Sequence, residues 1–254
     1  MDWSTSPATK ACWPRSTAVT RRPSSPGWSS RRTAWRAGIT HVAIDMSAIY
    51  AKAVRRALPH AVIVVDRFHV VKLANEMIDD VRRRTTQALR GRRGGKCDPE
   101  WVSRRRMLRG AERLTDDQRH KMFNKLETFD RDGGLVAAWI TKELLRKVLH
   151  CKDTGALSYE MRAAFDEFYT FAAACKVPEV RTLAATIDTW QQPIIAAIDT
   201  GLSNAKSEGT NRIVKHIGRI AFGFRNPTNQ RRRIRWACTG HTRPVPSRVR
   251  PLRP

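Results

Sequence analysis

The strongest constraint on the fold is a pair of short apolar segments that each end in an aspartate. Residues 39–45 (ITHVAID) and 61–66 (AVIVVD) are rich in β-branched side chains and apolar on both faces, as parallel strands are when helices cover the sheet. The residues between them carry apolar side chains at helical spacing and end before Pro59. The pattern therefore predicts a β-α-β unit.

The two aspartates, Asp45 and Asp66, are expected at the same edge of this sheet. A β-α-β crossover joins parallel strands of one sheet, so both residues leave the sheet at its carboxyl-terminal edge. Open α/β sheets bind ligands at that edge. A strand-end aspartate is equally typical of the N-cap of the next helix, and spacing alone leaves both readings open.

Helical periodicity dominates the chain after Asp66. One apolar helical face runs from Val70 to Leu89, and further helices are predicted at 115–130, 134–150, 158–175 and 180–200. A last helix is predicted from about Lys206, after a turn rich in Gly, Ser and Asn. The predicted fold class is α/β, with a sheet core that a large all-helical insertion interrupts.

The two ends of the chain follow neither a strand nor a helix period. Residues 1–38 are rich in Ser, Thr, Pro, Arg and Trp and are predicted to be unstructured, and residues 237–254 are predicted to form a disordered basic tail. The remaining residues divide into a core made of 39–79 and 201–236 and a helical insertion of residues 80–200.

The formal net charge of +25 favours a polyanionic partner. Twelve Lys/Arg and no Asp/Glu lie between residues 212 and 254, whereas residues 41–211 carry 22 acids against 29 bases. DNA is therefore the expected partner of the carboxyl-terminal part. The candidate DNA-binding residues are Lys206, Arg212, Lys215, Arg219, Arg225, Arg231, Arg232 and Arg233.

The sequence shows no sign of a membrane partner. No apolar run reaches 18 residues and no export signal begins the chain, so we expect a cytoplasmic, nucleoid-associated protein. The five cysteines contain no CxxC pair and suggest neither a zinc cage nor a disulfide framework.

Three acids from separate predicted elements, Asp45, Asp66 and Glu208, form a candidate metal-ligand set. Phosphoryl transfer on nucleic acids commonly uses two divalent cations held by a few carboxylates, and Mg²⁺ prefers such oxygen ligands. Glu208 lies in the first turn of the last predicted helix, where an ordinary first-turn glutamate is the alternative. His69, one turn beyond Asp66, could orient that aspartate or be a structural histidine.

Three segments together resemble bacterial insertion-sequence transposases of the ISL-three family, over about residues 39–236: VAIDMSAIY, ALPHAVIVVDRFHVVKLAN and TGLSNAKSEGTNRIVKHIGRIAFGFRNP. The resemblance implies an RNase H-like fold with a helical insertion, a DDE active site with two magnesium ions, and cutting and rejoining of transposon-end DNA. By motif, Asp45 is similar to the second catalytic aspartate and Glu208 to the catalytic glutamate. Asp66 and His69 resemble the Asp-x-x-His signature of related enzymes, and direct metal contact by Asp66 stays open.

The sequence also departs from the family pattern. The first catalytic aspartate of the family, and the zinc-binding and helix-turn-helix region before it, have no counterpart in residues 1–38. The resemblance therefore predicts a truncated transposase that is inactive alone, with an incomplete sheet core whose first strands are missing. Its expected partners are transposon terminal inverted repeats, target DNA, and a second copy or an intact transposase. The alternatives are a non-catalytic basic DNA-binding protein or regulator, and a remnant without a retained role.

Overall fold

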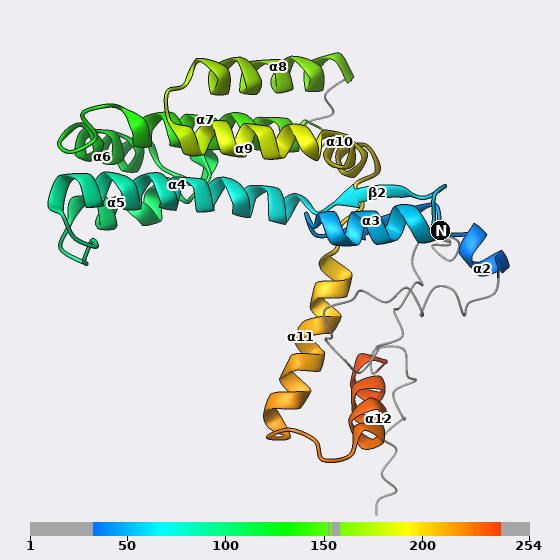
Figure 1. The fold of residues 1–254 in the computed structure, drawn as a ribbon. Coiled ribbons are helices and arrows are strands. Elements are labelled where there is room, and N and C mark those ends of the chain that lie inside the picture. Colours follow the sequence, from blue (N-terminus) through cyan, green and yellow to red (C-terminus); the bar gives the residue numbers. More distant parts are fainter. Residues whose placement is uncertain (1–32, 152, 154–157, 240–254) are drawn as a thin grey trace, which may run out of the picture. The chain divides into compact units, whose positions relative to one another are not determined.

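The computed structural model describes residues 33–151, 153 and 158–239 of the 254-residue chain (Figure 1). The predictions that residues 1–38 are unstructured and that residues 237–254 form a disordered tail lie largely outside these residues. Where the structure describes the two segments, residues 33–37 and 237–238 are helical, so both predictions are wrong there. The first described element is the short helix α2 (Thr33–Ala37). Arg36 Nη2 donates a hydrogen bond to Ala57 O at 2.6 Å, which attaches α2 to the last residue of the next helix.

The predicted β-α-β unit is confirmed. Strands β1 (His41–Ile44) and β2 (Val62–Val65) pair in parallel and are joined by helix α3 (Ala48–Ala57). Within the described residues they form a two-stranded sheet. A small apolar cluster holds the unit together, and its buried members are Ile44, Ala51, Val54 and Ile63.

The prediction that residues 80–200 are helical is confirmed for the described residues. The helices are α4 (Arg67–Arg90), α5 (Pro99–Met107), the 3₁₀ turn η2 (Ala111–Arg113), α6 (Asp116–Glu127), α7 (Gly134–His150), α8 (Ser158–Ala174), α9 (Pro178–Thr189) and α10 (Gln191–Thr200). Helix α4 packs against α7 and α9, while α10 packs against β2. The main apolar core therefore continues from the sheet into the helices, because Val65 and Val70 belong to the same buried cluster as the residues of α7 and α8.

The prediction of one helix over 180–200 is wrong, because α9 ends at Thr189 and α10 begins at Gln191. Trp190 between them has φ −106° and ψ 12°, outside the helical range. Pro193 explains the break, because it has no N–H to donate and its ring clashes with the carbonyl of Thr189, four residues earlier. A proline in the first turn of a new helix avoids both problems.

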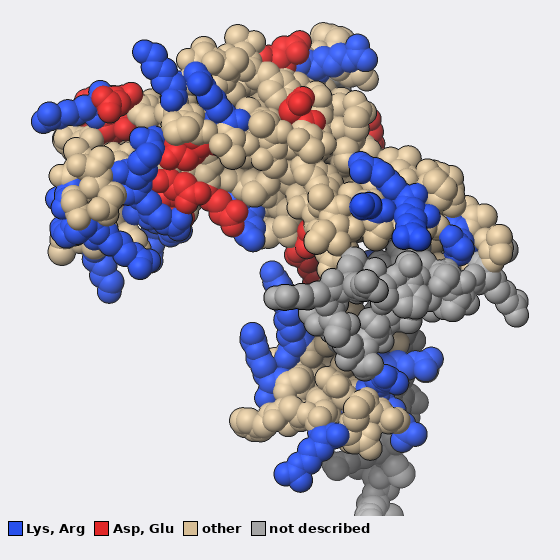
Figure 2. Space-filling view, viewed as in Figure 1, with Lys and Arg blue, Asp and Glu red and all other residues tan. Residues whose placement is uncertain are grey.

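The described residues fall into two compact units, divided between Ser203 and Asn204. In the second unit, α11 (Ala205–Ile220) and α12 (Pro227–Cys238) pack on each other as a helical hairpin. The periodicity of the sequence does not predict α12. Asn226 begins it by accepting hydrogen bonds from Thr228 N at 2.9 Å and Asn229 N at 3.3 Å, and Lys and Arg side chains gather over the hairpin (Figure 2).

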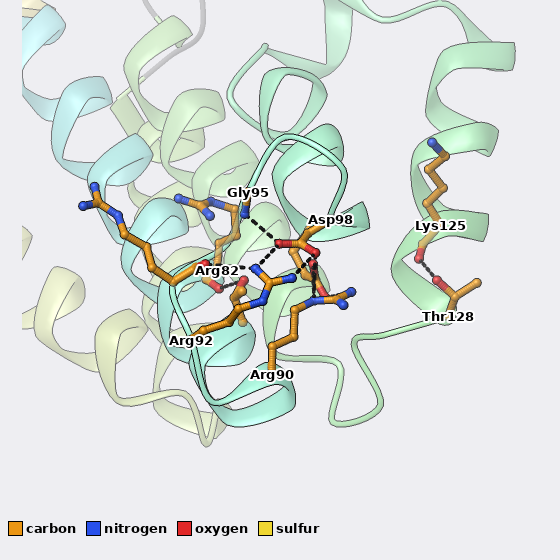
Figure 3. Close-up of polar contacts among 10 residues, drawn as sticks. Arg82, Arg90, Arg92, Gly95, Asp98, Lys125 and Thr128 are labelled. Atoms are coloured by element: carbon orange, nitrogen blue, oxygen red, sulfur yellow. Dashed lines mark hydrogen bonds and ion pairs between the residues drawn. The ribbon is translucent and has the colours of Figure 1, made fainter.

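Arginine–carboxylate contacts fix the loop between α4 and α5 in the first unit (Figure 3). Asp98 accepts two hydrogen bonds from Arg92, at 2.9 and 3.0 Å, and one from Gly95 N at 2.6 Å. The hydrogen bonds from Arg92 and Gly95 lower the pKa of Asp98 to about 2. Arg90 donates to the buried Glu100 at 3.0 Å. These contacts close the loop against the start of α5.

A second ion-pair cluster ties α4 to α5. Both oxygens of Asp79 accept hydrogen bonds from Arg104, each at 2.6 Å, and Arg82 Nε donates to Oδ1 at 3.3 Å. Burial of Asp79 opposes its ionisation, but the hydrogen bonds and charges of Arg104 and Arg82 outweigh burial and lower its pKa. Asp79 is therefore held as a carboxylate by two arginines from two helices.

Among the described residues, no helix is both long and apolar enough to cross a lipid bilayer.

Candidate functional site

Asp45 and Asp66 lie at the carboxyl ends of the two paired strands. Asp45 directly follows β1 and Asp66 directly follows β2. The register pairs Ile44 with Val65, so the two aspartates leave the sheet at the same level. The predicted shared edge is confirmed.

The two aspartates have different local roles. Asp66 is the N-cap of α4: it is 5% exposed, and its Oδ1 accepts a hydrogen bond from Phe68 N at 2.9 Å. The cap interpretation is therefore confirmed for Asp66. The N-cap of α3 is Ser47, so the cap interpretation is wrong for Asp45, whose side chain is 49% exposed. Of the two strand-end carboxylates, Asp45 is the accessible one.

The side chain of His69, from helix α4, lies close to Asp45. It lies in the first turn of α4, and its Nε2 is 3.6 Å from Asp45 Oδ1. The ring of Phe68 meets the imidazole edge-on, with 5.6 Å between the centroids. The His69 side chain is only 19% exposed, so the residues around it restrict its orientation. The spacing of the residues along the chain does not indicate this contact.

Glu208 belongs to the second unit, in the first turn of α11. Its N–H donates to Asn204 O at 3.0 Å, which makes Asn204 the start of the helix. At helical spacing, Glu208 shares a face with Asn211, Arg212 and Lys215. A first-turn acid is also favoured by the helix dipole, so this position alone does not distinguish a metal ligand from an ordinary helix residue.

The candidate DNA-binding residues all lie in the second unit, where Figure 2 shows blue side chains over α11 and α12. Lys206, Arg212, Lys215 and Arg219 lie on α11, Arg225 in the turn, and Arg231, Arg232 and Arg233 on α12, and all of them are exposed. Arg235 of α12 is a further exposed cation that is not among the predicted DNA-binding residues. Glu208 is the one acid among described residues 204–239, so this unit carries a large charge excess.

Comparison with known proteins identifies the class of protein. The model of the ISL3 family of DDE enzymes, described as "Transposase", matches residues 26–234. The chain therefore belongs to this transposase family, and the resemblance seen in its motifs is confirmed.

The chain is similar in sequence to two curated transposases. The chain is 34% identical over 232 residues to the transposase for insertion sequence element IS1557 of Mycobacterium tuberculosis (strain CDC 1551 / Oshkosh), with 84% of this chain and 50% of that protein covered. It is 28% identical over 209 residues to the transposase for IS1001 of Bordetella parapertussis, with 81% and 49% covered. The chain thus spans about half the length of these relatives. No solved structure matches it significantly.

Proposed function

We propose that this chain acts in metal-dependent cleavage and transfer of DNA strands at the ends of an insertion sequence. Asp45 and Glu208 hold divalent metal, and the cations of α11 and α12 hold the DNA. The observation that carries the proposal is the contact between Asp45 and His69 at the carboxyl edge of a parallel sheet, in a chain of the transposase family. Residues 39–79 and 201–236 would contribute to an RNase H-like core and residues 80–200 would be its helical insertion.

The chemistry of Asp45 fits Mg²⁺ or Mn²⁺. Its carboxylate is a hard oxygen donor, the kind of ligand that Mg²⁺ prefers. The side chain is half exposed, and the N-cap of the next helix is another residue, Ser47. A divalent ion can therefore reach the carboxylate without breaking a cap. When bound, two such ions would lower the pKa of the attacking water and neutralise charge on the phosphate.

His69 and Asp66 act in positioning. The imidazole of His69 lies 3.6 Å from Asp45 Oδ1 and restricts the orientations of that carboxylate, as outer ligands commonly do around a metal site. Asp66 Oδ1 accepts the hydrogen bond from Phe68 N and so fixes the first turn of α4, which carries His69. Through this cap, Asp66 contributes to the site without contacting the metal.

The cations of the second unit supply the DNA-holding step. Lysine and arginine side chains that contact phosphates displace condensed counterions, so binding weakens steeply as salt rises. Nine Lys/Arg against one acid in residues 204–239 are enough for several such contacts. Phosphate contacts position DNA and carry no sequence information, so recognition of particular transposon ends would need other residues.

Iron-mediated backbone cleavage tests the metal site without requiring turnover. Fe²⁺ replaces Mg²⁺ in the solution of the full chain, ascorbate is added, and the resulting fragments are mapped by mass spectrometry. We expect cuts close to Asp45 and close to Glu208, suppressed by excess Mg²⁺. Asp45→Ala and Glu208→Ala should each abolish the cuts at both places. Asp116 is an exposed acid at the start of α6. Asp116→Ala is therefore the matched control for the removal of a negative charge, and it should leave the cleavage pattern unchanged.

Two results would count against the proposal. Cuts near Asp45 that survive Glu208→Ala would show that Glu208 is not part of the metal site. A protein that only coats DNA would show no localised cuts, and its DNA affinity would rise slightly in both alanine variants because a negative charge is removed.

A further inference from the structure

Phe222 has an unusual backbone conformation in the turn between α11 and α12. Its φ is 49°, the one positive value at a non-glycine residue in the described part of the chain. Its N–H donates to Arg219 O at 3.0 Å, and the N–H of Gly223 donates to Gly218 O at 3.0 Å. These two hydrogen bonds define a Schellman motif at the end of α11, with Phe222 at the C′ position.

Stability of the hairpin does not explain a phenylalanine at this position. The C′ residue of a Schellman motif is usually glycine, because a Cβ atom is strained at positive φ. The Phe222 side chain is 101% exposed, so its ring gains no packing from the described residues. A bulky residue kept in a strained backbone conformation is a reason to look for a functional role.

The charges around Phe222 indicate the chemistry of its partner. Arg219 lies in the last turn of α11 and Arg225 three residues after Phe222, and both are exposed. Residues 204–239, to which all three belong, carry nine Lys/Arg and one acid, and a charge excess of this size favours a polyanion. Nucleic acid offers both phosphates for the guanidinium groups and flat bases for the ring.

We propose that Phe222 stacks on an unpaired base beside the duplex that the hairpin holds. The proposal rests on the proposed DNA-holding function of α11 and α12 and adds a preference for DNA in which a base is already open. Stacking on an aromatic side chain is tolerant of base identity. An unpaired base costs less to reach than one inside an intact duplex, so the ring should favour forked DNA over blunt DNA.

The test compares the affinities of the full chain for a blunt duplex and for a forked duplex of the same length and sequence. We expect the wild type to bind the forked duplex more tightly. Phe222→Ala should reduce this preference by about tenfold, within the range of the stacking free energy of one base. Affinity for the blunt duplex and its salt dependence should stay unchanged, because the arginines remain.

Two further variants separate stacking from structural effects. Ile220→Ala removes an exposed apolar side chain at the end of the same helix and should keep the preference for forked DNA. Phe222→Gly removes both the ring and the backbone strain. It should lose the preference as Phe222→Ala does while raising the urea midpoint of unfolding, so the loss is not a result of unfolding.

The outcomes distinguish this proposal from the function on which it rests. If Phe222→Ala keeps the wild-type preference while binding remains salt-dependent, the stacking role is wrong and the DNA-holding role stands. If the wild type binds neither duplex, the DNA-holding role itself is wrong. If Phe222→Ala changes only the particle size in light scattering, the ring serves a protein contact and the stacking proposal is overturned.

Discussion

Replacing Asp66 separates the two roles that a strand-end aspartate can have, a helix cap and a metal ligand. Asp66→Asn keeps a side-chain oxygen that can accept the 2.9 Å hydrogen bond from Phe68 N but removes the negative charge at the start of α4. Asp66→Ala removes both. The loss of the charge next to the helix dipole costs about 0.3–1 kcal/mol, and the loss of the cap costs about 1 kcal/mol more.

Urea unfolding of the full chain, followed by circular dichroism, measures these costs. We expect the free energy of unfolding to fall in the order wild type, Asp66→Asn, Asp66→Ala, with about 1–2 kcal/mol lost in the alanine variant. Because the cap is kept, Asp66→Asn should also keep the iron-cleavage pattern near Asp45. An asparagine variant of wild-type stability that loses this pattern would show that Asp66 contacts the metal, and an alanine variant of wild-type stability would refute the cap.

Three further predictions concern the ion pairs and the basic hairpin. Asp79→Ala removes the Asp79 partner of Arg82, whose side chain is 4% exposed, and leaves a buried charge. The free energy of unfolding, measured in urea, should fall by about 3–5 kcal/mol. Asp80→Ala, which breaks an exposed pair with Arg83, is the control and should lower it by less than about 1 kcal/mol. Asp98 has a folded-state pKa of about 2 against an ordinary value of 3.8. Its contribution to stability is therefore present above pH 3.8 and is lost as the pH falls to about 2. Asp98→Asn should flatten the pH dependence of the urea midpoint between these two pH values. The triple variant Arg231→Ala, Arg232→Ala, Arg233→Ala should reduce the slope of log affinity against log salt by about 0.9 for each phosphate that the variant no longer neutralises, and an unchanged slope would remove α12 from the DNA-binding surface.

The sequence was sufficient to predict the β-α-β unit because both strands are β-branched on two faces and the helix between them has a clear apolar side. It did not distinguish Asp45 from Asp66. Each ends an apolar segment, but α4 starts directly after Asp66, whereas α3 starts only after Ser47. Which residue caps a helix depends on the local backbone angles, and residue type alone does not determine these.

Contacts between distant elements were also out of reach of the sequence. The approach of His69 to Asp45 depends on how α4 leaves the sheet, and no spacing rule gives that direction. Helix α12 was missed because its sequence, PTNQRRRIRWAC, is mostly polar and offers only a weak apolar stripe. Its packing on α11 and its Asn226 cap provide the stabilisation that the periodicity does not reveal.

The positive charge of the chain has different physical consequences in the two units. In the first unit, arginines such as Arg92 and Arg104 pair with Asp98 and Asp79, and these carboxylates are buried or nearly so. Such pairs are screened little by salt, so these arginines stabilise the packing of helices and their charge is already compensated. In the second unit, nine cations face a single acid, and no internal arrangement of that unit can neutralise them. Residues 204–239 are therefore where a polyanion gains most from binding, although arginine is common in both units.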